Sequence, residues 1–245
     1  MKKEIHLHPD FKYLKADIAH LISEKEGDII YGGRNQVKIV EVNNEKFVVK
    51  HFKKITFANK IIYRFFRKSK AHRSYDNALK LKDLGIPTPE PVAYVAIYGS
   101  LTLKRSIFIS RYVDYEKTDP SATTPISEDL VEGYANFIHF LHQKGVFHQD
   151  LNLGNMLFKK INGVYQFCLI DNNRMRFHAP TVPSITKNLN RVYMPFKFYS
   201  LFTYTYALLA EINPYLFMQK LLKYRKKKIL KNRIKYSFKH ALGLI

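Results

Sequence analysis

Two short stretches constrain the fold of this chain more than any other part. The first is Val146–Asn155, which contains Asp150 and ends at Asn155, five residues after that aspartate. The second is Leu169–Asn173, in which Asp171 follows an apolar run. An Asn-Gly pair between them predicts a hairpin turn. A loop, a hairpin and a second loop are therefore expected to bring the two carboxylates and the amide together.

The hairpin itself is expected to consist of two short strands. Residues 156–158 are apolar and predict a buried strand, and Asn162-Gly163 is typical of a two-residue turn. Residues 164–170 predict the returning strand, which ends just before Asp171.

These side chains suit phosphoryl transfer from ATP. Such a reaction needs a carboxylate near the acceptor hydroxyl and oxygen ligands that hold Mg²⁺ on the phosphates. In the pattern His-x-Asp, Asn, Asp, we assign Asp150 as the catalytic base and Asn155 and Asp171 as the metal ligands. His148 is expected to hold the loop through hydrogen bonds.

At these residues the sequence resembles the lipopolysaccharide core kinases, which phosphorylate Kdo or heptose sugars and share a superfamily with the RIO kinases and aminoglycoside phosphotransferases. The stretch His148–Asn155 looks like their catalytic loop, and Leu169–Phe177 looks like the segment standing where protein kinases carry Asp-Phe-Gly. The resemblance runs from about residue 31 to residue 177. It implies a two-lobed α+β protein-kinase-like fold, with a β-rich N-lobe at 1–113 and a helical C-lobe at 114–245, and ATP and Mg²⁺ as cofactors.

The first part of the chain carries candidate nucleotide-binding residues. Residues 29–40 predict strand, turn and strand, with Gly32 and Gly33 where kinases have a longer glycine-rich loop over the phosphates. A plain hairpin is the alternative there. An apolar strand then ends at Lys50, after a hairpin turn at 43–44, and this ammonium is expected to pair with the α- and β-phosphates.

A helix is expected at 74–84 and is ended by Gly85. Kinases carry a glutamate on this helix that pairs with the strand lysine, but no Glu is present, and Asp76 is the nearest substitute. The strand at 106–113 is then expected to lead to the hinge, where the backbone near Tyr112 and Val113 binds adenine. The polar stretch 115–125 marks the lobe boundary.

Charge points to an anionic partner. The chain has 41 Lys+Arg against 20 Asp+Glu, a net charge of +21. Such a field favours nucleic acid, an anionic membrane or a phosphorylated substrate. No zinc-finger, RNP-type or basic-zipper pattern is present, which makes nucleic acid the weaker choice. The one cysteine, Cys168, excludes an internal disulfide.

Basic and large apolar residues alternate in two segments, 51–73 and 216–239. The pattern suits an interfacial membrane helix, single-stranded nucleic acid, or a helix with a solvated basic face. A short amphipathic helix is also expected around 14–22. With no signal peptide or spanning segment evident, we expect a cytoplasmic protein that is peripheral on an anionic inner membrane, takes a lipid-linked sugar as substrate and has no protein partner.

Three alternatives stay open at this point. They are a kinase for a protein or small-molecule acceptor, a catalytically weak pseudokinase suggested by the missing glutamate and the short glycine loop, and a basic nucleic-acid-binding module.

Overall fold

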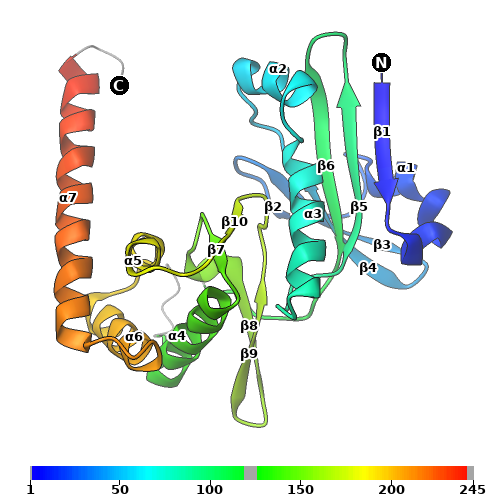
Figure 1. Ribbon diagram of the computed structural model, residues 1–245. Helices are drawn as coiled ribbons and strands as arrows, with labels where there is room; N and C mark the ends of the chain where they lie inside the picture. The colour runs from blue at the N-terminus through cyan, green and yellow to red at the C-terminus, as the bar shows by residue number, and fades with distance from the viewer. Residues whose placement is uncertain (1, 119–125, 242–245) are drawn as a thin grey trace. The chain divides into compact units, whose positions relative to one another are not determined.

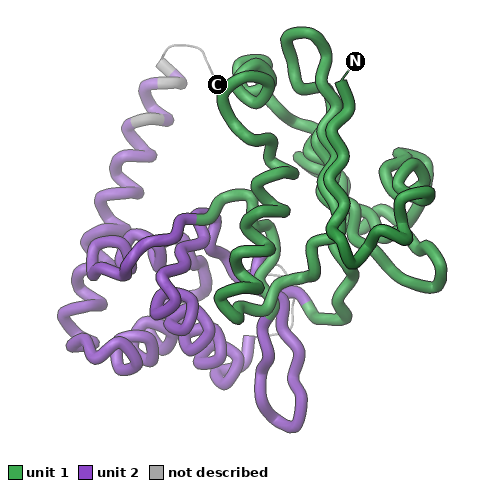
Figure 2. The backbone as a smooth tube through the Cα atoms, turned by 45° about the vertical axis from the view of Figure 1, so that its right-hand side comes forward, with its two compact units in different colours: residues 1–116, 168–175 green, residues 117–167, 176–245 purple. Residues whose placement is uncertain are grey.

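The structure, a computed structural model, describes residues 2–118 and 126–241 (Figure 1). The chain forms two compact units, one of residues 1–116 and 168–175, the other of residues 117–167 and 176–245 (Figure 2). The sequence placed one boundary after residue 113. The difference arises chiefly because 168–175 is hydrogen-bonded to the first unit, for example from Leu169 N–H to Pro87 O at 2.8 Å. Part of the expected boundary segment, 119–125, lies outside the described residues.

A six-stranded antiparallel sheet is the framework of the first unit. In sheet order its strands are β1 (Lys2–Leu7), β5 (Pro91–Tyr98), β6 (Leu103–Arg111), β4 (Glu45–His51), β3 (Gln36–Val42) and β2 (Asp28–Tyr31). The edge strand β1 was not predicted. The turn between β3 and β4 is confirmed, since Asn43 and Asn44 have φ of 52° and 62°, as a two-residue hairpin turn requires.

Helices cover both faces of this sheet. The 3₁₀ helix η1 (Pro9–Lys15) and helix α1 (Ile18–Leu21) pack their apolar residues onto one face. Helices α2 (Phe57–Phe65) and α3 (Lys70–Asp83) cover the other face of the sheet, where Tyr75 packs against Tyr94. Alternation along β4 puts Phe47 and Val49 toward η1 and Lys50 toward α3.

Two predicted helices differ in their bounds. Helix α3 begins at Lys70, four residues before the predicted start, because the Ser69 hydroxyl caps it by accepting the His72 N–H at 3.2 Å. Gly85 ends the helix as predicted, with a φ of 72°. The helix expected at 14–22 is split into η1 and α1, although its apolar residues are buried as expected.

The second unit is mainly helical, with short strands. Its elements are α4 (Glu128–Gln143), β7 (Val146–His148), η2 (Leu153–Asn155), β8 (Met156–Ile161), β9 (Val164–Leu169), β10 (Met175–Phe177), α5 (Val182–Leu189), α6 (Phe196–Leu209) and α7 (Pro214–Ala241). The β8–β9 hairpin is confirmed, with φ of 50° at Asn162 and 82° at Gly163. The end of β9 and the start of β10 belong to the first unit.

Helix α7 departs from the amphipathic pattern expected for 216–239. Its first half packs in the second unit, where Phe217 and Leu221 are buried and Arg225 donates to Val192 O. In the second half Ile229, Leu230 and Ile234 are all exposed, and at 100° per residue Lys226 and Arg233 fall between them around the helix, so no separate apolar face forms there. Among the described residues, no helix has the length and apolarity needed to span a bilayer.

Candidate active site

Lys50 and Asp171 form an ion pair in the first unit. Lys50 Nζ lies 2.8 Å from Asp171 Oδ1, and the two side chains are only 17% and 24% exposed. Lys50 extends from β4 with Val37 of β3 and Phe108 of β6 as its pairing neighbours. The prediction that the strand lysine, Lys50, lies close to Asp171 is therefore confirmed.

Hydrogen bonds fix the backbone around Asp171. The Thr88 hydroxyl donates to Leu169 O at 2.8 Å, and the Asn77 amide of α3 donates to Asn172 O at 2.6 Å. Asp171 itself has a φ of 60°, a left-handed conformation that aspartate tolerates better than most residues. The turn directs its carboxylate to Lys50 and to the amide of Asn173.

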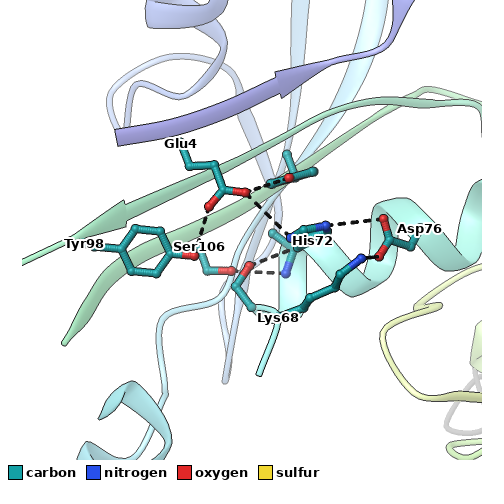
Figure 3. A network of polar contacts seen from close by, with 9 residues as sticks. Glu4, Lys68, His72, Asp76, Tyr98 and Ser106 are labelled. Atoms are coloured by element: carbon teal, nitrogen blue, oxygen red, sulfur yellow. Dashed lines mark hydrogen bonds and ion pairs between the residues drawn. The ribbon is translucent and has the colours of Figure 1, made fainter. Parts of the chain in front are cut away.

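Asp76, the nearest substitute for the missing glutamate, does not pair with Lys50. Its carboxylate lies 2.6 Å from Lys68 Nζ and 3.5 Å from His72 Nε2 (Figure 3). The reason is helical geometry, because Asp76 points to the side of α3 that carries His72, whereas its neighbour Asn77 reaches the 168–175 segment.

The other predicted nucleotide contacts differ in what they offer. Gly32 and Gly33 are exposed in the turn between β2 and β3. Strand β3 pairs with β4, the strand that carries Lys50. The Tyr112 N–H is already bonded to Lys46 O at 2.9 Å, so the predicted contact of this residue with adenine falls to its carbonyl group. Val113 accepts from the Tyr115 N–H through its carbonyl, and its own N–H has no acceptor in the described part of the chain.

In the second unit, the loop after β7 presents Asp150 to solvent. Its backbone is held on both sides, since its N–H donates to His148 Nδ1 at 3.1 Å and its carbonyl accepts from the amides of Asn152 at 3.0 Å and Asn155 at 2.8 Å. Its carboxylate has no hydrogen-bond donor among the described residues. The backbone of Asp150 is thus fixed while its side chain is left available as a base.

A series of buried hydrogen bonds holds the loop that carries Asp150 in place. The Asn188 amide of α5 donates to His148 O at 2.8 Å, so its oxygen accepts from His142 Nε2 at 2.9 Å. His142 Nδ1 must then accept from the Tyr206 hydroxyl, at 2.7 Å. Burial, the main cause, lowers the pKa of His142 to about 4, so this histidine is neutral at pH 7.

An aromatic stack supports the same loop. Phe147 lies between the rings of His142 and His178, at centroid distances of 4.6 and 4.3 Å. Gly145 makes this approach possible, because a Cβ there would lie 2.8 Å from His178 O and its φ is 71°.

The residues fit Mg²⁺ and nucleotide in chemical type. Because Asn155 uses its NH₂ group to bond Asp150 O, its side-chain oxygen is the atom left over, and it has no partner among the described residues. Asp171 supplies a carboxylate beside an ammonium. Mg²⁺ is commonly held by one or two such oxygens together with substrate phosphates.

Comparison with known proteins decides the family. The profile of the lipopolysaccharide kinase (Kdo/WaaP) family matches residues 16–210. The chain belongs to this family. It is therefore a kinase. No curated protein sequence matches it significantly.

Solved structures confirm the kinase-like α+β fold. A structure of WaaP in complex with acyl carrier protein is similar with a TM-score of 0.61 at 17% identity, covering 93% of this chain and 98% of that one. The Rio2 kinase ADP/Mg²⁺-phosphoaspartate complex from Chaetomium thermophilum has a TM-score of 0.50 at 17% identity, with coverages of 94% and 78%. A second Rio2 structure from the same organism also scores 0.50 at 17% identity, with coverages of 90% and 76%.

Several residues that position the site in this kinase were not found from the sequence. Asn77, Thr88 and Asn188 each donate to a backbone carbonyl far along the chain, and Tyr206 bonds the ring of His142 in α4. Asn188 offered one signal, since an amide within the apolar stripe of a short helix is buried only when it is hydrogen-bonded.

Proposed function

We propose that this kinase transfers the terminal phosphoryl group of ATP to a hydroxyl of a Kdo or heptose sugar in the lipopolysaccharide inner core. The observation that carries the proposal is the 2.8 Å ion pair between Lys50 and Asp171, in a chain of the lipopolysaccharide kinase family. A strand lysine and an aspartate after an apolar strand are the groups with which a kinase holds nucleotide phosphates and metal.

We assign one role to each site residue. Asp150 orients the acceptor hydroxyl and takes its proton as the oxygen attacks phosphorus. Lys50 holds the phosphates, Asn155 and Asp171 are the residues that would hold Mg²⁺, and Val113 offers a main-chain N–H to adenine. The bound metal supplies positive charge that offsets the charge of the phosphates.

The exposed face of α2 supports docking on an anionic membrane. Phe57, Ile62 and Phe65 are 71%, 39% and 53% exposed and lie on one side of the helix, so its apolar face points to solvent. Cations flank that face, at Lys60, Arg64 and positions beyond the helix. An exposed apolar face with flanking cations is the pattern of an interfacial helix, and each cation near an anionic surface contributes about 1 kcal/mol.

The enzymatic proposal is tested with purified protein, ATP, Mg²⁺ and a lipid-linked Kdo or heptose acceptor. Mass spectrometry should show a gain of about 80 daltons on a core sugar, the mass of one phosphoryl group. Transfer should be lost in Asp150→Asn, which keeps size and shape. Phosphate found in added protein but not in the lipid would overturn the acceptor assignment, and full activity in Asp150→Asn would overturn the base.

Membrane docking is tested by sedimentation with vesicles that contain anionic lipid. Phe57→Ser with Phe65→Ser should reduce binding, whereas Val164→Ser, which removes an apolar side chain that is 67% exposed in the β8–β9 hairpin, should not. Equal binding by all three proteins would contradict docking through α2. Salt-sensitive binding to RNA, with none to the vesicles, would favour the nucleic-acid alternative.

A further inference from the structure

A cavity of about 180 Å³ in the first unit is lined by six cations and by no acid among the described residues. The cations come from separate segments: Arg34 follows the glycine pair, Lys54 and Arg67 flank α2, Lys70 and Arg73 lie on α3, and Arg174 follows Asp171. The remaining lining residues are neutral and include Thr56, the residue that caps α2.

The cations destabilise one another in the absence of a counter-charge. Burial first, and then the charges of Arg34 and Arg174, lower the pKa of Lys70, and Asp171 only partly offsets them. Burial is also the main cause of the lowered pKa of Arg73. Both lie in the first turn of α3, where the helix dipole disfavours positive charge.

Hydrogen-bonding capacity is also left unused. Arg73 Nε and Nη1 are buried and have no hydrogen-bond partner among the described residues, and the guanidinium lies 5.4 Å from the centre of the Tyr63 ring. None of the six cations forms an ion pair within the described residues. Buried polar groups are rarely left unpaired, so a ligand that accepts hydrogen bonds is expected here. Guanidinium and ammonium donors around a helix N-terminus match the acceptors of a phosphate group.

We propose that this cavity binds a phosphate group already present on the acceptor. Arg174, three residues after Asp171, lines the cavity, and the charge of Asp171 acts on Lys70, another lining residue. A phosphate held there would therefore place the acceptor next to the Lys50–Asp171 pair. That the phosphate belongs to the acceptor rests on the proposed function, but the existence of the oxyanion site does not. The kinase thereby selects acceptors that carry a phosphate in addition to the reacting hydroxyl.

Binding of inorganic phosphate tests the site directly. Calorimetry is done at constant ionic strength with ADP and Mg²⁺ saturating, so that phosphate cannot bind where the α- and β-phosphates of the nucleotide lie. We expect Lys70→Met to weaken phosphate binding about tenfold to a hundredfold, the effect of one charge-assisted hydrogen bond. Lys12→Met, an exposed lysine on η1 at the opposite face of the sheet, is the matched control and should bind like wild type.

Two outcomes would overturn the phosphate site. Equal phosphate affinity in wild type, Lys70→Met and Lys12→Met would overturn it. Displacement of the phosphate by a non-hydrolysable ATP analogue, but not by ADP, would also overturn it, because the cavity would then hold the terminal phosphate of the nucleotide. Arg73→Lys, which keeps the charge but removes the fork of donors, should give an intermediate loss and guards against misfolding of Lys70→Met.

Kinetics identify the carrier of the phosphate. Lys70→Met should raise KM for a phosphorylated acceptor about tenfold or more, yet leave KM for the same acceptor after phosphatase treatment unchanged. An equal rise for both acceptors would overturn the acceptor assignment. Failure of the whole kinase proposal would look different, since no transfer would occur to either acceptor while phosphate binding persisted.

Discussion

Lowering the pH from 7 to 5 should destabilise the fold through two buried histidines. His142 in the second unit and His51 in the first are 2% and 3% exposed. Burial lowers the pKa of each from 6.5 to about 4, and for His51 the charges of Arg105 and Lys38 act in the same direction. Between pH 6.5 and 4 the unfolded chain therefore binds more protons, so stability is complete above 6.5 and is lost as the pH falls.

The magnitude follows from the same values. With these pKa values, each histidine lowers the free energy of unfolding by about 2 kcal/mol when the pH falls from 7 to 5. The two histidines together lower it by about 4 kcal/mol if the two units unfold together. Paired carboxylates such as Glu90, with a lowered pKa, act mainly below this range. Urea unfolding at the two pH values measures the loss, and His142→Gln should reduce it by about half.

NMR titration of the His142 ring gives the decisive measurement. The ring should remain neutral down to pH 5. A midpoint near 6.5 would refute the assignment of a neutral, Nε2-protonated His142 between Tyr206 and Asn188.

Three substitutions test the positioning of the loop. Asn188→Leu should lower the free energy of unfolding by about 2–6 kcal/mol, because it leaves His148 O and His142 Nε2 buried and unpaired, and an unchanged urea midpoint would contradict the network. Asp150→Asn should leave Tm unchanged because its carboxylate has no donor in the described chain, while kcat falls at least about a hundredfold. Gly145→Ala should lower stability by at least about 1–2 kcal/mol through its positive φ and the contact with His178 O, measured by thermal unfolding.

Local chemistry allowed the sequence to predict the turns and the kinase-like fold. An Asn-Gly or Asn-Asn pair between strand-forming residues specifies a left-handed turn within four or five residues, so no distant contact is needed to recognise it. The catalytic-loop pattern likewise lies within one short stretch. The roles of Asp150 and Asn155 stay predictions, whereas the Lys50–Asp171 pair is present as expected.

Contacts between distant segments could not be predicted in the same way. Asp76 and Asn77 are adjacent in sequence, yet only Asn77 reaches the 168–175 segment, and the choice depends on how α3 rotates against the sheet. The N-terminal strand β1 pairs with β5, and its outward residues are mostly exposed, so it lacks the buried pattern by which strands are recognised.

The proposed roles of Lys50 and of the cationic cavity fit the absence of a glutamate on α3. An acidic side chain on the face of α3 that lines the cavity would pair with Lys70 or Arg73 in the free protein. It would thereby offset part of the positive charge of the cavity. In the proposed function, the phosphates of the nucleotide and of the acceptor supply the negative charge instead, so binding of both should depend on the basic field. Added salt should therefore raise KM for ATP and for the acceptor.

The same salt should not lower Tm, because repulsion among the six cations is screened at the same time. Both quantities are measured over one series of sodium chloride concentrations, with Lys70→Met beside wild type. The variant has one cation fewer in the cavity, so its acceptor KM should respond less steeply to salt. A KM independent of salt in both proteins would show that the cavity charges do not act on the ligands, and Lys50 would then need another source of attraction for the nucleotide.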